Sequence, residues 1–406
     1  MISNDIVIFG ILAAILALLF FLRQKGGVWD RVFTFIPIIL LCYLLPSLLV
    51  SFGLIDTSES NLWTVAKDFF LPAALVLLTL SIDMKGIIGL GPKALVMFFT
   101  ATVGIVLGGP VALWLVASFE PSVLGSGNDA AWRGFATLAG SWIGGGANQT
   151  AMLEVYQYNP ERYGAMVAVD IVVANIWMAF LLYGAGMSDK IDKWLGADSS
   201  SIDRLRDTMA EYSAQVERTP SSNDLIVLMG VTFAAVGTAH LFAGMLPGFF
   251  ENLFSTPDAV LASGFFWVVV ISTTIGLAAS FTRARSLEGI GASKFGTVFI
   301  FLLVAIIGTK MDIFQLGDAP LFMAVGMIWM LFHAILLLAV AKLIKAPFFF
   351  VAVGSKANVG GAASAPVVAG AFHPALAPVG VLLAVLGYAL GTYGAILAAT
   401  MMRAVS

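Results

Sequence analysis

The segment GSWIGGGANQTAM, residues 140–152, interrupts a chain that otherwise consists of apolar stretches long enough to cross a membrane. A second segment of the same character, GSKANVGGAASAP, occupies residues 354–366. Both combine glycines with hydroxyl and amide side chains. Backbone that is not helical at membrane depth is tolerated only where protein buries it or where it lines a wet cavity. The two segments therefore predict an internal binding site rather than ordinary lipid-facing spans.

The composition is that of a polytopic membrane protein. The chain has 406 residues, of which 60% are hydrophobic and 11% are charged, whereas soluble domains carry about a quarter charged residues. The single cysteine, Cys42, excludes an intrachain disulfide. Residues 1–23 have no basic n-region and no small-residue cleavage site, so they are expected to form a first span. No basic domain is present, and no nucleic-acid partner is expected.

Ten apolar stretches are predicted to span the membrane, near residues 5–22, 32–52, 66–82, 93–118, 162–187, 224–246, 259–281, 294–309, 319–343 and 375–402. The glycine-rich segments 134–157 and 347–372 lie between the fourth and fifth and between the ninth and tenth of these. Each could be a broken span that crosses, or a re-entrant hairpin that leaves on the side it entered.

The distribution of basic residues favours two hairpins, because Lys and Arg accumulate in cytoplasmic loops. With hairpins, one side of the membrane collects only five of the 21 basic residues, and apart from Lys356 the other side collects the rest. The five are Lys67, Arg133, Arg162, Lys310 and Arg403. A model with two crossing segments divides the basic residues far more evenly.

The hairpin model predicts an all-α protein built from two inverted repeats of five transmembrane helices, each with a Gly-rich hairpin or broken helix. The first repeat covers residues 1–187 and the second covers 224–406, joined by a cytoplasmic linker at 188–223. Both termini then face outward. One offset of 214 residues aligns Gly140–Ser141 with Gly354–Ser355. The same offset aligns Gly146 with Gly360 and Asn159–Pro160 with His373–Pro374. Inverted repeats with interrupted helices are typical of secondary transporters.

The glycine segments supply the candidate substrate-binding residues. Glycines let backbones approach closely, and a helix that starts beyond a break presents free N–H groups to an anion. The alternative is close helix packing by small residues, but two corresponding segments with amides and hydroxyls favour a site. The candidates are Ser141, Gly145, Gly146, Asn148, Gln149, Ser355, Lys356, Asn358, Gly360, Gly361 and Ser364.

An ionisable residue at membrane depth marks the candidate ion-coupling site. Asp170 lies about nine residues into its predicted span, roughly 13 Å deep at ~1.5 Å per residue, where a bare carboxylate is costly. A cation ligand or proton acceptor fits best. Lys356 could neutralise Asp170 or bind a substrate carboxylate, and the sequence leaves both open. Asn148, Thr150, Asn175 and Glu154 complete this candidate set. His240, His333 and His373 are scattered, so no metal site beyond one for Na⁺ is predicted, and each is expected to be a satisfied or interfacial histidine.

The two hairpin segments and the tail HPALAPVGVLLAVLGYALGTYGAILAA, residues 373–399, resemble an uncharacterised bacterial and plant family of integral membrane proteins, domain of unknown function 819. The resemblance covers nearly the whole chain. More distantly, the two five-span halves are similar to sodium–glutamate symporters and 2-hydroxycarboxylate transporters. That similarity implies ion coupling, a homodimer and elevator-like movement. The GGxG-type turn of those transporters is only approximated by Gly144–Gly146 and Gly360–Gly361.

The expected function is a cation-coupled secondary transporter, using Na⁺ or H⁺, of a small anionic organic solute, in the inner or plasma membrane. A cation/proton antiporter without organic substrate is the alternative within transporters, and a non-transporting receptor or scaffold is the alternative outside them. An enzyme is not expected, because the chain has no GxGD motif for an intramembrane aspartyl protease. ATP-driven transport is not expected either, because no GxxxxGK[ST] motif is present. No cofactor is expected except Na⁺ as a coupling ion.

Overall fold

The protein is all-α in the part that the structure describes. The structure is a computed structural model, and it describes residues 1–35, 38–197, 202, 220–248, 264–310, 319–373 and 376–406. The helices of the first half are α1 (Asp5–Lys25), α2 (Val28–Phe35), α3 (Ile38–Ser51), α4 (Leu62–Val65), η1 (Ala66–Phe70), α5 (Leu71–Leu80), α6 (Met84–Gly89), α7 (Pro92–Phe119), η2 (Pro121–Leu124), η3 (Gly127–Asp129), α8 (Ala131–Val155), α9 (Tyr163–Ala185) and α10 (Ser188–Leu195). Those of the second half are α12 (Ser222–Ala243), α14 (Gly264–Ser280), η4 (Arg283–Ile290), α15 (Ala292–Gly308), α16 (Ala319–Ile344), α17 (Phe348–Asn358), α18 (Gly361–Phe372) and α19 (Ala377–Ala404).

Seven helices in the described part are long and apolar enough to cross a membrane, or eight if α14 and η4, bent by 95°, count as one span. The polytopic prediction is therefore confirmed. The predicted spans near 32–52 and 294–309 correspond to α3 and α15, which have only 14 and 17 residues.

Apolar side chains remain exposed on the outer helices. On α7 they recur at helical spacing, at Val96, Phe99, Val103, Leu107, Val111 and Trp114.

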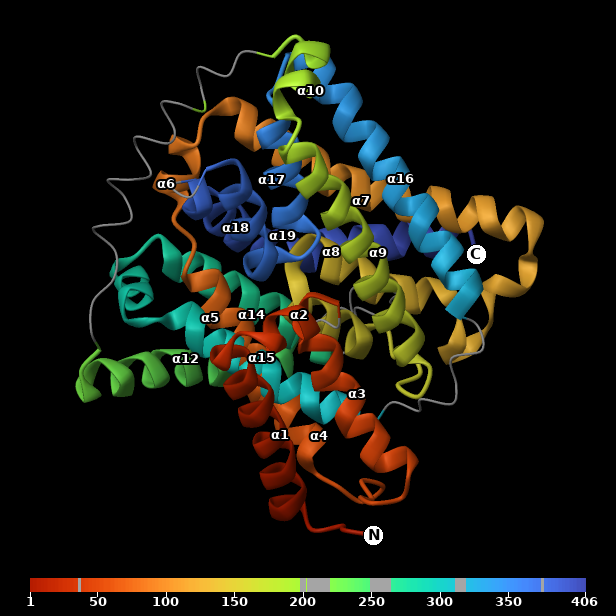
Figure 1. Ribbon diagram of the computed structural model, residues 1–406. Helices are drawn as coiled ribbons and strands as arrows, with labels where there is room; N and C mark the ends of the chain where they lie inside the picture. The colour runs from red at the N-terminus through yellow and green to blue at the C-terminus, as the bar shows by residue number, and fades with distance from the viewer. Residues whose placement is uncertain (36–37, 198–201, 203–219, 249–263, 311–318, 374–375) are drawn as a thin grey trace.

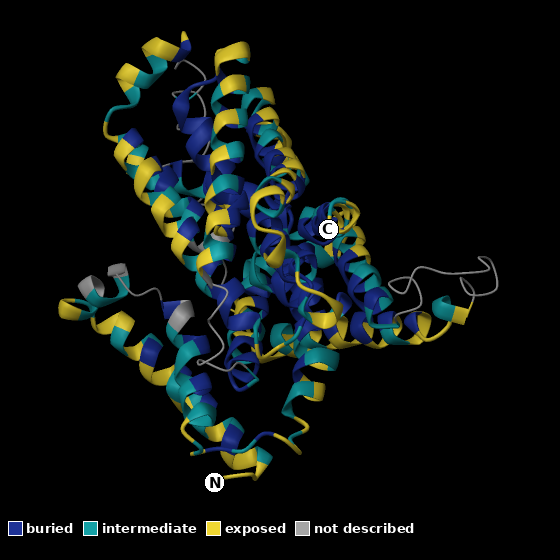
Figure 2. Ribbon diagram, turned by 90° about the vertical axis from the view of Figure 1, so that its right-hand side faces the viewer, coloured by how far each residue is buried: buried dark blue, intermediate teal, exposed yellow. Residues whose placement is uncertain are grey.

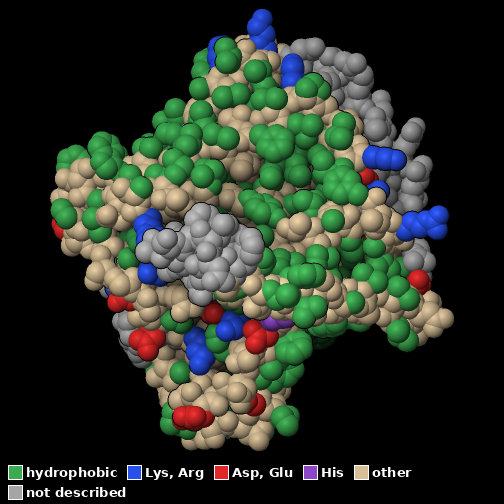
Figure 3. All heavy atoms as spheres, turned by 180° about the vertical axis from the view of Figure 1, so that it is seen from behind, with side chains coloured by type: hydrophobic (Ala, Val, Ile, Leu, Met, Phe, Trp, Pro, Cys, Tyr) green, Lys and Arg blue, Asp and Glu red, His purple; other side chains and the backbone are tan. Residues whose placement is uncertain are grey.

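The surface pattern fits a protein surrounded by lipid. Hydrophobic side chains cover much of the face in Figure 3, while acidic and basic side chains lie together in its lower part and further basic side chains lie at its top and side edges. Figure 2 shows that buried residues concentrate along the inner faces of the helices, and most of the buried side chains are hydrophobic. Lipid requires an apolar outer surface, and the packing of the helices requires an apolar core.

The helices form two groups (Figure 1). In one group α5 packs against α12, α14 and α15, and α15 packs against α3 and α1. In the other group α7 packs against α16 and α17, and α19 packs against α8 and α18. Helix α14 contacts both α8 and α19, so it links the groups.

The first glycine segment folds back on itself inside α8. Gly145 has φ +74° and ψ −170°, a conformation that glycine adopts far more easily than other residues. A Cβ placed on Gly140 would lie 2.6 Å from the carbonyl oxygen of Asn148, and one on Gly134 would lie 2.9 Å from the ring of Tyr158. Residues before and after Gly145 therefore run antiparallel, as the basic-residue distribution predicts for a hairpin.

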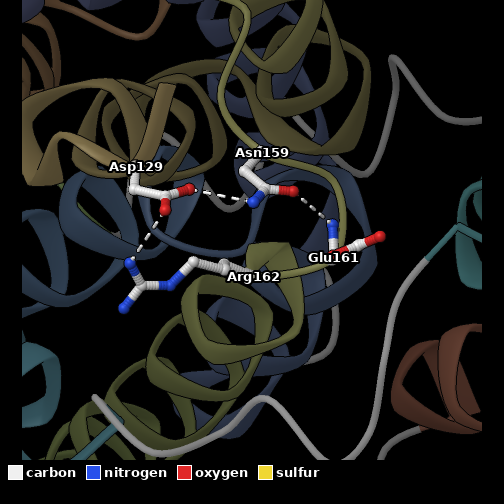
Figure 4. A network of polar contacts seen from close by, with 4 residues as sticks. All are labelled: Asp129, Asn159, Glu161 and Arg162. Atoms are coloured by element: carbon white, nitrogen blue, oxygen red, sulfur yellow. Dashed lines mark hydrogen bonds and ion pairs between the residues drawn. The ribbon is translucent and has the colours of Figure 1, made fainter. Parts of the chain in front are cut away.

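A polar network holds the two ends of this first hairpin together (Figure 4). Asp129, which precedes the hairpin, accepts a 2.9 Å hydrogen bond from the Asn159 amide and pairs with Arg162 at 3.4 Å. The side-chain oxygen of Asn159, Oδ1, accepts the backbone N–H of Glu161 at 3.0 Å. Because the residues on either side of the hairpin meet here, its entrance and exit lie at the same end.

The second glycine segment forms a hairpin of two separate helices, α17 and α18. Gly360 and Gly361 at the turn have φ +116° and +56°. At the other end the ring of Phe372 lies 6.2 Å from that of Phe348 and 5.3 Å from that of Phe349, centroid to centroid. The chain thus leaves the second hairpin beside the point where it entered.

The two hairpins approach α19 from opposite ends. A Cβ on Gly387, near the middle of α19, would lie 2.6 Å from the carbonyl oxygen of Ile143 and 3.5 Å from that of Ala357, so both tips meet there. Arg403, near the end of α19, lies over the ring of Trp132 at the base of the first hairpin, whereas the second hairpin ends just before α19 begins. Opposite entry is what an inverted repeat requires, and the inversion of the whole halves stays a prediction.

The linker prediction at 188–223 concerns residues that mostly lie outside the described part. Its first eight residues form α10, where Asp192 accepts the backbone N–H of Phe348 at 2.7 Å. Burial raises the pKa of the Asp192 carboxyl. This bond satisfies one of the free N–H groups at the start of α17, so the start of the linker supports the base of the second hairpin.

Candidate functional site

One face of α9 lies between the two hairpins. Asp170, Ala174 and Trp177 are four and three residues apart, so they lie one above another on that face. Each makes a hydrogen bond to a hairpin residue. The first hairpin contacts this face at Asp170, and the second hairpin contacts it at Ala174 and Trp177.

The first hairpin surrounds Asp170 with hydrogen-bond donors. The Ser141 hydroxyl donates to Oδ2 at 2.6 Å, and the Trp142 indole Nε1–H donates to Oδ1 at 2.8 Å. Gln149 is buried and lies close enough to act on the carboxylate. Its side-chain amide acts as a further donor toward the Asp170 carboxylate, and it makes no close hydrogen bond to the other described residues.

The second hairpin places an ammonium and a hydroxyl against α9. Lys356, only 2% exposed, donates from Nζ to the Ala174 carbonyl at 3.1 Å. Ser355 Oγ accepts from the Trp177 indole at 2.8 Å and lies 2.8 Å from Nε2 of His333. A serine oxygen can accept two hydrogen bonds as well as donate one, so the direction of the Ser355–His333 bond depends on the tautomer of His333. The expectation of a satisfied histidine holds at Nε2, whereas the buried Nδ1 makes no close hydrogen bond to the described residues.

Two polar side chains, Lys356 and Ser364, face Gly360 at the tip of the second hairpin. A Cβ on Gly360 would lie 3.1 Å from Lys356 Nζ and would overlap the Ser364 hydroxyl. That hydroxyl is buried and has no hydrogen-bond partner among the described residues. Helix α18 starts at the next residue, Gly361, without a side-chain cap, so its first N–H groups and positive dipole end face the same region. Ammonium, hydroxyl and helix N-terminus together suit a carboxylate.

The two charges of the site act on each other. Asp170 and Lys356 interact electrostatically, yet the ion pairs formed by the described residues do not join them within 4.0 Å. Burying opposite charges without direct contact is expensive, because each loses hydration that its partner only partly replaces. The arrangement therefore leaves both groups able to gain from a charged or protonated ligand.

The predicted site residues Asn148 and Asn358 lie at the tips but attach the hairpins to neighbouring spans. Asn148 accepts from Thr392 of α19 at 2.6 Å, and Asn358 accepts from Thr102 of α7 at 2.8 Å. Thr150 donates to a backbone carbonyl in its own hairpin at 3.0 Å. These hydrogen bonds hold the hairpins in place, and the roles of the three side chains at the site stay predictions. The glycines at 145, 146, 360 and 361 shape the backbone of the two tips.

The structure does not bring Asn175 and Glu154 to the site. The amide of Asn175 is exposed and donates to the carbonyl of Ile171 at 2.7 Å. It lies off the Asp170 face, because five residues are about one and a half turns. Glu154 pairs with Lys67 at 3.9 Å, toward the base of the first hairpin. In this geometry neither side chain contacts the Asp170 carboxylate, and their roles as ion ligands stay predictions.

Three aromatic residues of the site were not predicted as such: Trp142, Trp177 and His333. Trp142 lies inside the GSW segment itself, and Trp177 lies seven residues after Asp170, which is the helical spacing for the same face. His333 comes from α16 and carries no signal of this kind. Among the described residues, no group of three or more His, Cys, Asp or Glu side chains could hold a metal ion.

Comparison with known proteins places this geometry in a family without an assigned activity. A family model described as "Protein of unknown function (DUF819)" matches residues 10–405. The "Uncharacterized membrane protein YjcL" of Bacillus subtilis (strain 168) is 26% identical over 345 residues, which cover 82% of each chain. The match to the family model spans both hairpins and all the helices that carry the site.

Proposed function

Because the chain belongs to the DUF819 family, which supplies no activity, we propose a function from the site itself. The protein is a secondary transporter that moves a small anionic organic solute together with a cation across the inner or plasma membrane. The observation that carries this proposal is the meeting of two oppositely entering hairpins at one face of α9. A buried carboxylate and a buried ammonium lie at that place.

The tip of the second hairpin is suited to the solute. Interrupted helices in transporters direct half-helix N-termini at anionic substrate groups. Here the start of α18 faces the region that Lys356 and Ser364 also face. A carboxylate there would receive a charge-assisted bond from the ammonium and a bond from the unpaired hydroxyl, which are the stronger kind of hydrogen bond. Gln149, whose amide also acts on the Asp170 carboxylate, would add a donor from the first hairpin.

Asp170 is suited to the cation. It is the acidic side chain that hairpin and helix together enclose, and a carboxylate at membrane depth is costly unless it serves binding. Uptake of Na⁺ or H⁺ would neutralise it while the solute neutralises Lys356. Transport needs no chemical conversion, and we propose neither an enzymatic activity nor a resident cofactor.

Alternating access would come from movement of one helix group against the other. The group of α7, α8, α9 and α16–α19 carries the whole site, while the group of α1, α3, α5, α12, α14 and α15 contacts it through few elements, chiefly α5 and α14. This division supports an elevator-type movement, with the second group held fixed in a homodimer. It also supports the inverted repeat, with both termini outside.

A cation/proton antiporter without organic solute is the second candidate, favoured by the electrostatic contact of Asp170 with Lys356. In that case the pair alone would exchange ions. Lys356→Gln distinguishes the two candidates. A symporter loses solute binding but keeps a cation effect on the protein, whereas an antiporter loses the cation effect as well.

The proposal is tested by thermal stability and uptake. A ligand that binds only the folded protein raises its melting temperature. The purified protein would be screened with potassium salts of acetate, lactate, succinate, citrate and glutamate, and each stabilising acid would be offered, radiolabelled, to proteoliposomes. We expect one acid to stabilise the wild type and to be taken up, Lys356→Gln to lose both effects, and Asp170→Asn to lose uptake. Glu154→Gln, a carboxylate away from the site, is the matched control and keeps both.

No stabilisation by any acid, or equal uptake by empty liposomes, would contradict transport of a carboxylate of this size. Loss of uptake in Glu154→Gln as well would show that the assay reports general damage and not the site.

A further inference from the structure

We propose that the coupled cation is a proton, that Asp170 carries it on Oδ2, and that Ser141 is the group that permits this. The inference rests on the proposed function and names its coupling ion. The geometry that carries it is the set of donors around the Asp170 carboxylate.

The surroundings of Asp170 oppose a sodium ion. Sodium is held by several oxygen lone pairs, as hard cations are in general. Both carboxylate oxygens instead face hydrogen atoms, from the Trp142 indole on Oδ1 and the Ser141 hydroxyl on Oδ2. An ammonium, Lys356, acts on the same carboxylate. A sodium ion would have to displace both donors and approach a positive charge.

The same surroundings accept a proton with one small change. A hydroxyl both donates and accepts, and its hydrogen rotates to suit, whereas an indole N–H only donates. When a proton from water binds Oδ2, the new O–H can donate to Ser141 Oγ while the Ser141 hydrogen turns away. Oδ1 then keeps its bond from Trp142. No bond between heavy atoms forms or breaks, and the charge of the carboxylate falls from −1 to zero.

The other titratable groups around α9 leave this role to Asp170. Tyr43 of α3 and Tyr163 of α9 are buried phenols that feel the Asp170 charge, and phenols do not ionise near neutral pH. His333 of α16 has its Nε2 bonded to Ser355. The segment of α8 at the site presents Ser141, Trp142 and Gln149, which carry no charge, and α18 presents Ser364. The acidic and basic residues of α10 lie beyond the end of α9. Lys356 is therefore the charge that controls Asp170.

This control couples the proton to the solute. While Lys356 has no anionic ligand, its charge favours the ionised form of Asp170, because an opposite charge nearby stabilises a carboxylate. A solute carboxylate at Lys356 cancels that effect, and Asp170 then takes up a proton. When the solute leaves, the ammonium charge again favours the ionised form of Asp170, and the proton is released. The result is symport of one proton with one carboxylate group.

Infrared difference spectroscopy tests the protonation directly. The C=O stretch of a protonated carboxyl shifts in D₂O, and subtraction of Asp170→Asn from wild type isolates the Asp170 signal. We expect this band to appear as pH falls, and at the same pH in NaCl and in KCl. In Lys356→Gln it should appear at a pH higher by about 1 unit or more, since an opposite charge contributes shifts of that size.

Variants of the two donors test the role of Ser141. Trp142→Phe removes a group that can only donate, and its bond to Oδ1 is stronger when the carboxylate is ionised than when it is protonated, so the band should appear at a higher pH than in wild type. Ser141→Ala removes a group that serves both forms, so the shift should be smaller, and Ser141→Thr should behave as wild type. Equal shifts in Trp142→Phe and Ser141→Ala would overturn the role assigned to Ser141.

Failure of this inference can be separated from failure of the proposed function. If a sodium gradient drives uptake and no Asp170 band appears at any pH at which the protein is folded, transport stands and proton coupling is wrong. If no acid is taken up under any gradient but the band behaves as described, Asp170 binds a proton and the transporter proposal is wrong. Glu154→Gln should leave the Asp170 band unchanged.

Discussion

Asn148 and Asn358, at the tips of the two hairpins, make the same set of three hydrogen bonds. Each amide nitrogen donates to the carbonyl four residues earlier in its own hairpin, at 2.9 Å and 3.0 Å. Each also donates to a neighbouring span, at Tyr388 and Phe98. Each amide oxygen accepts the hydroxyl of the threonine four residues beyond that contact. The two hairpins are thus attached to α19 and α7 by one repeated device.

Removing one of these attachments should destabilise the protein. Asn148→Leu leaves the Thr392 hydroxyl and two carbonyls without their buried partner, and an unsatisfied buried group costs about 1–3 kcal/mol. We expect a lower melting temperature in detergent, and a similar loss for Thr392→Val. Because the two side chains share a bond, the double variant should lose less than the sum of the single losses. Additive losses would show that the bond contributes nothing.

The contact between the first hairpin and α19 should not tolerate a methyl group. A Cβ on Gly391 would lie 2.5 Å from the Cα of Gly144 and 2.6 Å from the side-chain carbon and nitrogen of Asn148. Overpacking of this kind costs about 1–3 kcal/mol, so Gly391→Ala should lower both the melting temperature and the yield of folded protein. Gly237 of α12 has nothing within 4 Å of its Cβ position, so Gly237→Ala is the matched control. An equal loss in both variants would contradict the packing.

The turn of the first hairpin should depend on Gly145 more than on its neighbour. The backbone of Gly145 has φ +74°, where a side chain costs about 1–3 kcal/mol. A Cβ at Gly146 would meet only the edge of Ile300, at 3.4 Å. We therefore expect Gly145→Ala, measured by thermal unfolding, to be the more destabilised of the pair. The reverse order would mean that the chain turns at a different residue.

The sequence was sufficient to predict the hairpins because their signals are local or cumulative. Glycines next to amide side chains mark the positions where the helices break. Because Lys and Arg collect on one side of the membrane, the chain is expected to leave each glycine-rich segment on the side from which it entered. Asp170 was identified because a carboxylate in an apolar span is costly, and such residues usually bind an ion, a proton or a substrate. Lys356 was identified as its partner or a solute ligand; the structure buries it beside α9, and both roles stay predictions.

The faces of the site residues could not be predicted from the sequence. Asn175 is polar and close to Asp170 in sequence, yet it points away, while Trp177 reaches the second hairpin through a bond across 178 residues. The gapless offset of 214 pairs Asn148 with Ala362, whereas the hydrogen bonds pair it with Asn358, 210 residues away. The sequence alone does not reveal this shift. A hairpin tip can gain or lose residues while its asparagine keeps the same hydrogen bonds to the neighbouring helix.

A cross-link between the two helix groups should arrest transport. Thr273 of α14 and Thr392 of α19 have their hydroxyl oxygens 3.3 Å apart, close enough for a disulfide after a small adjustment, since the S–S bond is about 2.05 Å. The chain has one cysteine, the buried Cys42, so the pair would be introduced into Cys42→Ala. Oxidation should protect both new thiols from a maleimide reagent. If the groups slide past one another, the oxidised protein takes up no solute, and reduction restores uptake. The two single-cysteine variants, treated alike, control for weakening of the Asn148 attachment. Undiminished uptake by the fully oxidised pair would show that α14 and α19 stay together, and the movement would then have to lie within the hairpins themselves.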